Sequence, residues 1–327
     1  MLLKNSFSKK KWMTSFLSIG FSFVFVYIIP WDNLKEFNDV ENYINRIVYL
    51  VGGGIESEYS GISIISSEFL WKYILLYLSS LDFFDHNYRA VLQFISFMSL
   101  FIYTRFSLKR IHFIIFLLLV FNPLFMHLII EQVRIALAFS LLLVIYEYRD
   151  IKWIYILIAA CILIHTASLL LVFIYILLEV VIRLLNKNKV YIYALIASFI
   201  LAIFLKFGVD AVLGFLGDRR ANASVRTSSL LFSVFWLYNA LMLVLYCKKN
   251  NADLIRIASY SIFMMGLFFS SSIMGSYGQR YVAISFPLII ISISGIKNYH
   301  VKYASVFLFV LYNLLSWFYW FKLFNYL

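Results

Sequence analysis

Long apolar segments recur along almost the whole chain, and they constrain the fold more than any other feature. A membrane-spanning α-helix needs about 20 mainly apolar residues. Because 63% of the 327 residues are hydrophobic and only 13% are charged, a water-soluble core would not accommodate these segments. The sequence therefore predicts an all-α polytopic integral membrane protein that forms one transmembrane domain over residues 1–327. The clear candidate spans are 12–30, 89–106, 111–130, 131–147, 190–207, 229–247, 254–274, 280–296 and 301–322.

Two further segments are ambiguous. Residues 68–84 are amphipathic, and residues 153–182 form a long apolar run interrupted at His165. In the preferred arrangement, 68–84 lies on the outer surface and 153–182 is a broken or re-entrant hairpin. Five basic residues then face the cytoplasm, as the positive-inside bias favours: Arg105, Lys109, Arg110, Arg149 and Lys152. The alternative is that 68–84 spans and 153–182 is one tilted helix. Both arrangements have about eleven transmembrane helices and a cytoplasmic N-terminus.

Two extramembrane segments then face outside. Residues 31–67 form a polar, acidic loop ahead of the amphipathic segment 68–84. Residues 208–228 form a basic loop that contains Arg219, Arg220 and Arg226. Basic residues on the outer side run against the positive-inside bias. They are candidates for binding an anionic ligand, with an ordinary solvated loop as the alternative.

Ionisable residues inside membrane segments are costly and indicate functional sites. Three positions matter here: Glu131-Gln132-Val133-Arg134 at a helix start, His165 in the hairpin break, and Arg280 where a short outer loop meets a helix. Glu131 and Arg134 have the spacing of an i,i+3 pair. The alternatives are an anchoring ion pair, a histidine bonded to a carbonyl, and an arginine that reaches into lipid headgroups.

All three positions fall on the outer side in the preferred topology, which favours one shared cavity. Arginine suits phosphate because its guanidinium is planar, always charged and able to bind in a bidentate manner. Arg134, Arg280 and the arginines of 208–228 are therefore expected to hold a diphosphate. The groups available as a base are Asp39, Glu68, Glu131 and His165.

Several functional classes are excluded. The net charge of +12 is explained by cytoplasmic loops rather than by nucleic-acid binding. Cys161 and Cys247 lie in or beside apolar segments and suggest neither a disulfide nor a metal site. The sequence has no Asp-x-Asp pair, no Walker A motif, no Gly-x-Ser-x-Gly and no His-Glu-x-x-His. We therefore expect neither a cofactor nor a metal.

The order of these features resembles the EpsG-type polysaccharide polymerases, within the wider O-antigen polymerase (Wzy) group, over nearly the whole chain. One departure is Glu-Gln-Val-Arg, where the family more typically has adjacent Arg and Gln. In chain order, the matching positions are Asp39 and Tyr43, Glu68, Asn122-Pro123, then Gln132, Arg134 and Ala138, then His165 and Ser168, and finally Arg280.

The resemblance implies a glycosyltransferase in the bacterial cytoplasmic membrane. It would join undecaprenyl-diphosphate-linked repeat units into O-antigen, capsule or exopolysaccharide at the periplasmic face. His165 or Asp39 would act as the base, with Arg134 and Arg280 on diphosphate or sugar. The other substrate-binding candidates are Arg219, Arg220, Arg226, Gln132, Glu68 and Tyr43. A flippase and a chain-length regulator of the same pathway would be partners, together with membrane lipid.

The sequence is also compatible with two other classes of membrane protein. A flippase or exporter of lipid-linked oligosaccharide would also use an arginine-lined cavity. Transporters often show paired halves with broken helices, whereas this sequence has one break and no evident internal repeat. A membrane acyltransferase would use His165 as its base. It would need a second polar partner such as Asp or Asn near that histidine, and none is evident in the sequence.

Overall fold

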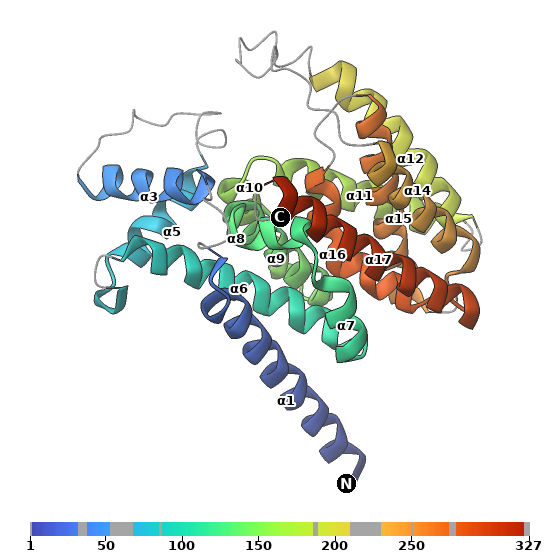
Figure 1. Ribbon diagram of the computed structural model, residues 1–327, viewed down its shortest axis with the longest axis horizontal. Coiled ribbons are helices and arrows are strands. Elements are labelled where there is room, and N and C mark those ends of the chain that lie inside the picture. The colour runs from blue at the N-terminus through green and yellow to red at the C-terminus, as the bar shows by residue number, and fades with distance from the viewer. Residues whose placement is uncertain are drawn as a thin grey trace. The chain divides into compact units, whose positions relative to one another are not determined.

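The computed structural model describes residues 2–31, 38–52, 68–84, 87–185, 189–209, 230–249, 251–274 and 279–323. These residues are overwhelmingly helical and include no β-strand (Figure 1). The chain divides into two compact units. Unit 1 comprises Met1–His112, Phe125–Phe173 and Trp320–Leu327, and unit 2 comprises Phe113–Leu124 and Ile174–Tyr319.

Some helices begin in one unit and end in the other. The helices that lie mainly in unit 1 are α1 (Leu2–Phe23), η1 (Val24–Ile28), α3 (Asn38–Val51), α5 (Phe69–Ser79), η2 (Asp82–Phe84), α6 (Tyr88–Leu108), α8 (Pro123–Ile130), α9 (Val133–Glu147), η3 (Lys152–Tyr155) and α10 (Ile156–Ile164). Those mainly in unit 2 are α7 (Phe113–Val120), α11 (Ser168–Leu184), α12 (Val190–Phe204), η4 (Leu205–Val209), α14 (Leu230–Tyr246), α15 (Ala252–Ile273), α16 (Gln279–Ser294) and α17 (Tyr299–Leu323).

Within the described ranges, four helices are long and apolar enough to cross a membrane: Tyr88–Leu108, Val190–Gly208, Ala252–Ile273 and Tyr299–Phe321. A fifth span is obtained if α8 and α9, bent by 97°, are taken together. The membrane class is therefore supported, whereas about eleven spans is not confirmed. Further apolar helices of 10–17 described residues include Trp12–Ile28 and Phe69–Ser79.

One such break corrects the expectation of a continuous span over 111–130. The segment divides between α7 and α8, where Asn122 precedes a proline that cannot donate a hydrogen bond. In unit 2, Asn313 Nδ2 donates to the carbonyl of Leu118 (3.2 Å), and Trp317 Nε1 donates to that of Phe121 (3.2 Å). Side chains of α17 thus satisfy carbonyls near the interruption, as an apolar environment demands.

The segment 31–67 is not simply a loop, because residues 38–51 form helix α3. Its apolar residues Val40, Tyr43 and Ile47 recur at helical spacing and are buried, and Asp39 and Glu41 lie in its first turn. Negative charge is favourable at that end of a helix. The acidic composition that indicated a loop therefore belongs partly to the exposed face of an amphipathic helix.

The chain is interrupted at His165, where the sequence predicts a break. Helix α10 ends at Ile164 and α11 begins at Ser168, and His165 between them has an extended backbone (φ −152°, ψ 118°). The hairpin or re-entrant path of 153–182 through a membrane remains a prediction.

In unit 1, α6 and α9 pack against each other and run in the same direction. The rings of Tyr103 and Phe139 lie 5.9 Å apart, and Lys109 at the end of α6 forms an ion pair with Glu147 at the end of α9. The carboxyl ends of both helices therefore meet. Arg110 and Arg149 follow directly after these ends, so one end of the helix pair is basic.

In unit 2, α15 is buried along almost its whole length and packs against α12, α14 and α16. Its buried serines return hydrogen bonds to their own helix, as Ser259 Oγ does to the carbonyl of Ile255 (2.8 Å). Gly266 faces α12 so closely that an added Cβ would lie 2.2 Å from Ser198 Oγ. Small residues that allow close helix approach are typical of membrane helix packing.

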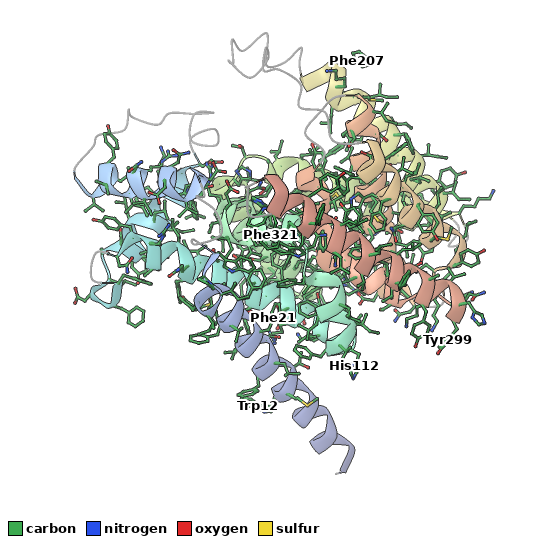
Figure 2. The ribbon with its side chains drawn as sticks, viewed as in Figure 1. Trp12, Phe21, His112, Phe207, Tyr299 and Phe321 are labelled. Atoms are coloured by element: carbon green, nitrogen blue, oxygen red, sulfur yellow. The ribbon has the colours of Figure 1, made fainter. Side chains whose placement is uncertain are left out.

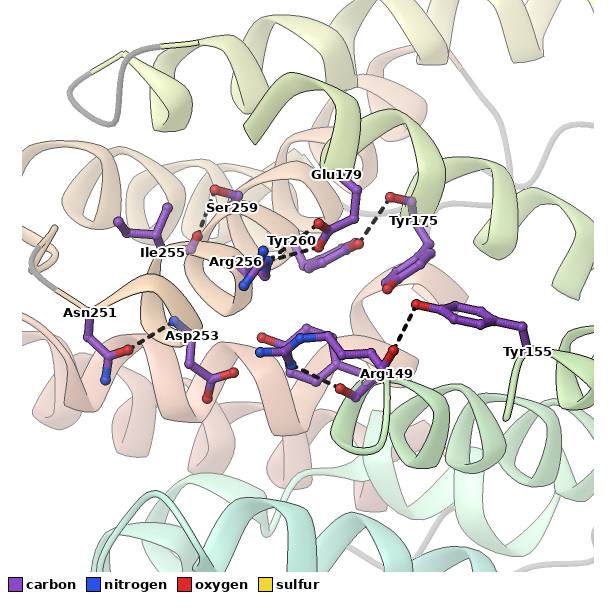
Figure 3. A network of polar contacts seen from close by, with 11 residues as sticks. Arg149, Tyr155, Tyr175, Glu179, Asn251, Asp253, Ile255, Arg256, Ser259 and Tyr260 are labelled. Atoms are coloured by element: carbon purple, nitrogen blue, oxygen red, sulfur yellow. Dashed lines mark hydrogen bonds and ion pairs between the residues drawn. The ribbon is translucent and has the colours of Figure 1, made fainter. Parts of the chain in front are cut away.

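The unit 2 part of α11 is joined to α15 by polar contacts (Figure 3). Arg256 Nε lies 3.1 Å from Glu179 Oε1, and Tyr260 OH donates to the carbonyl of Tyr175 (3.1 Å). The rings of Tyr175 and Tyr260 stack at 5.9 Å. The ion pair is largely buried, so loss of either partner would leave an uncompensated charge.

Many aromatic side chains lie on the outside of the helices. Trp12, Phe207 and Tyr299 project away from their helices in Figure 2, and each is more than half exposed. Exposed aromatic residues are costly in water but favourable in lipid and at membrane interfaces. This surface fits the membrane class.

Candidate functional site

The carboxylate of Glu68 is the centre of a buried polar cluster in unit 1. Its Oε2 forms an ion pair with Arg134 Nη1, and its Oε1 lies 2.6 Å from His165 Nδ1. The Glu68 side chain is only 10% exposed, so the carboxylate is held by two basic side chains rather than by water. The cluster joins residues separated by 66 and 97 positions in the sequence.

Tyr43 completes the cluster, which we call the tetrad (Tyr43, Glu68, Arg134 and His165). Arg134 Nε donates to Tyr43 OH at 3.0 Å, and the guanidinium carbon lies 5.1 Å from the centre of the Tyr43 ring. Tyr43 also packs edge-on against Trp71, with ring centres 5.6 Å apart. Nη2 of Arg134 has no partner among the described residues, so one nitrogen of the guanidinium can still bind a ligand.

Each ionisable member of the tetrad occupies the end of a helix. Arg134 lies in the first turn of α9, directly after the 97° bend, and His165 lies between α10 and α11. Glu68 is the N-cap residue of α5 and adopts a left-handed conformation (φ 53°, ψ 48°). Among the described residues it is the only non-glycine with positive φ. Such a conformation costs about 1–2 kcal/mol, and strained residues of this kind cluster at functional sites.

Glu131 does not pair with Arg134, contrary to the i,i+3 expectation. The i,i+3 rule applies within one helix, whereas Glu131 and Gln132 lie in the bend that precedes α9. Glu131 Oε2 instead lies 2.5 Å from His127 Nδ1 on α8, and His127 Nε2 accepts from Trp320 Nε1 at 2.9 Å. These contacts place the neutral-state proton of His127 on Nδ1. The His127–Glu131 spacing of i,i+4 was the signal in the sequence that we missed.

The other predicted site residues are placed differently. Asp39 lies on α3, one turn before Tyr43, and has no hydrogen-bond or ion-pair partner among the described residues. Gln132 is the N-cap residue of α9. Arg280 lies in the first turn of α16 in unit 2, but its side chain is not among those that the structure describes. Arg219, Arg220 and Arg226 lie entirely outside the described residues.

Three buried polar atoms close in sequence to the tetrad have no hydrogen-bond partner in the described protein. They are Trp71 Nε1, Gln132 Oε1 and Ser168 Oγ. Buried polar atoms are normally bonded, so each of these three can accept or donate a further hydrogen bond. Trp71 was missed by the sequence analysis, although it follows Glu68 at i+3 on α5.

A second buried cation lies on the same helix as Trp71. Lys72 is only 6% exposed. Burial, and then the nearby charge of Arg46, lower its pKa to about 8. The amphipathic pattern of residues 68–84 did not single out Lys72, because its burial depends on how α5 packs.

The arrangement of the tetrad suits proton transfer. A carboxylate bonded to Nδ1 fixes the imidazole in the tautomer that has its basic lone pair on Nε2, and it stabilises the imidazolium that forms when Nε2 takes a proton. Arg134 in turn places a positive charge against the Glu68 carboxylate. The tetrad is therefore a preorganised base, with a cation at hand for a ligand.

Comparison of the chain with protein-family models, with curated proteins and with solved structures finds no match.

Proposed function

We propose that the protein is a glycosyltransferase that polymerises lipid-diphosphate-linked sugar repeat units at the outer face of a bacterial cytoplasmic membrane. The tetrad is the main observation that supports this proposal. Four of the residues that resemble the positions of EpsG-type polymerases come from separate segments and contact one another in unit 1.

The direction of α9 supports an outer location for the site. Arg134 lies at its amino end, whereas the basic residues Lys109, Arg110 and Arg149 gather at its carboxyl end. The two ends are roughly 22 Å apart at 1.5 Å per residue. If the basic end lies in the cytoplasm, as the positive-inside bias favours, the tetrad lies near the outer side. About eleven crossings and a cytoplasmic N-terminus belong to this proposal.

The proposed reaction transfers a glycan from one lipid carrier to another. A sugar hydroxyl of the incoming repeat unit attacks the anomeric carbon of the growing glycan, and the bond from that carbon to the diphosphate oxygen breaks. His165 Nε2 takes the hydroxyl proton, and undecaprenyl diphosphate leaves with the electron pair. General-base assistance of this kind contributes about 10²–10⁴-fold to a rate.

The contacts of Arg134 refine its role. Glu68 already compensates the positive charge of Arg134. The main role of Arg134 is therefore to position Glu68 and His165, and only its Nη2 is offered to the substrate. Stabilisation of the leaving diphosphate therefore needs further cations. Arg280 and the arginines of 208–228 remain the candidates.

The test is gel analysis of surface polysaccharide from a deletion strain complemented with wild type or with His165→Ala. We expect the deletion strain to show single repeat units, and only wild type to restore the ladder. A deletion strain with no repeat unit on the outer face would instead indicate transport. A full ladder from His165→Ala would contradict the catalytic role of the tetrad.

A further inference from the structure

A cavity of about 190 Å³ lies in unit 1, between η1 with the residues that follow it, α3, the start of α6 and the end of α8. Its two sides differ in chemistry. Arg89, Gln93 and Ser96 lie at i, i+4 and i+7 on α6 and form a polar strip. The remaining walls are mainly apolar and aromatic, and include Pro30 and Trp31. Binding pockets typically combine apolar walls with a few placed polar groups.

Two groups of the polar strip are available to a ligand. Gln93 and Ser96 both line the cavity, and Ser96 is only 2% exposed. Neither side chain has a hydrogen-bond partner among the described residues. Other buried serines of α6 behave differently: Ser99 Oγ donates to the carbonyl of Ile95 at 2.9 Å. A buried hydroxyl that faces a cavity without a partner has a hydrogen bond to gain from an occupant.

Part of the apolar wall is built from unusual backbone. Residues Val24–Ile28 form a π-helical turn, and Val26 and Tyr27 from that turn line the cavity. Trp31 Nε1 donates to the carbonyl of Phe25 at 2.5 Å, which fixes the indole against the turn. Single π-helical turns occur frequently at functional sites. This observation is independent of the polar strip.

The charge of the cavity argues for a neutral ligand. Arg89 Nη2 lies 3.4 Å from Glu41 Oε1, so its positive charge has a carboxylate partner. A diphosphate would have to compete with that carboxylate. A sugar ring fits better, because its hydroxyls donate to and accept from Gln93 and Ser96, while its C–H faces contact the apolar wall.

The cavity also neighbours the tetrad. Val40, which lines it, lies one turn from Tyr43 on the buried face of α3, and Ile130 lies directly before the bend that leads to Arg134. We propose that the cavity binds one sugar ring of the lipid-linked repeat unit, with Gln93 and Ser96 as specificity-determining residues. This inference rests on the proposed function, which it extends from the reacting groups to the recognition of the glycan.

The test measures binding of two probes to the purified full chain in nanodiscs: lipid-linked repeat unit extracted from the deletion strain, and undecaprenyl diphosphate without sugar. We expect Gln93→Leu to weaken binding of the repeat unit about tenfold, and Ser96→Ala by a similar factor, as loss of one hydrogen bond predicts. Binding of undecaprenyl diphosphate should stay unchanged. Ser99→Ala is the matched control, and should alter neither affinity.

Two other outcomes would overturn the inference, and the binding data distinguish them. Equal weakening for both probes would make the cavity a headgroup site, and unchanged binding of both would remove it from the substrate path. Ser96→Ala deletes a single oxygen, so it keeps the test valid if Gln93→Leu fails to fold. A deletion strain that accumulates no single repeat unit would overturn the proposed function itself, and this inference with it.

Discussion

Glu68→Gln is the sharpest perturbation of the tetrad. The substitution keeps the shape of the side chain but removes the charge that lies between Arg134 and His165. The guanidinium then loses its counter-charge, and the one remaining acceptor, the amide oxygen, can no longer serve both the guanidinium and the imidazole. We therefore expect both the stability of the fold and the rate of polymerisation to fall.

The magnitudes follow from burial. Removing one partner of a buried ion pair costs about 3–5 kcal/mol. Because the Arg134 side chain is 27% exposed and can recover some hydration, we expect the lower end, about 3 kcal/mol. A misplaced general base should cost at least about 100-fold in rate.

The assay compares this variant with Glu147→Gln, which breaks the ion pair to Lys109 at the other end of the α6–α9 pair. Its partners are similarly buried, at 20% and 26% exposure, so the stability loss should be comparable. Polymer ladders in the complemented deletion strain report activity, and thermal unfolding in detergent reports stability. Only Glu68→Gln should abolish the ladder. Equal ladder loss in both variants would show that activity falls through stability alone, and would refute the catalytic role of Glu68.

Three further predictions concern the fold. Glu68→Gly should be more stable than Glu68→Ala by about 1 kcal/mol in unfolding experiments, because glycine adopts positive φ without strain; equal stabilities would exclude backbone strain. Gly266→Ala should lower the unfolding temperature by several degrees, because its Cβ would meet Ser198 Oγ at 2.2 Å, and Ser198→Ala should recover part of the loss. Burial, and then Arg46, depress the pKa of Lys72 to about 8, so its charged form is disfavoured in the folded state. Wild-type stability should therefore rise from pH 8 towards pH 10 by no more than about 3 kcal/mol, whereas Lys72→Met should be more stable at pH 7 and lack the rise.

The site was partly predictable. Glu68, Arg134 and His165 were identified as ionisable groups in or beside apolar segments, where they are costly enough to stand out. Tyr43 was matched only through the resemblance to the EpsG-type polymerases. Their mutual contacts were not predictable, because they join segments up to 97 residues apart. The prediction that Arg134 pairs with Glu131 was wrong. The i,i+3 rule assumes one continuous helix, whereas the chain bends between these two residues.

Composition and periodicity by themselves determined the helical membrane class, the approximate position of many apolar helices and the break at His165. These properties are local, because they follow from transfer of side chains into lipid and from hydrogen bonds within one segment. Tertiary structure alone decided which helices are short, which carboxylate holds Arg134, and where the polar side chains of α6 meet a cavity. Those outcomes depend on packing between distant segments, and no single stretch of sequence encodes such packing.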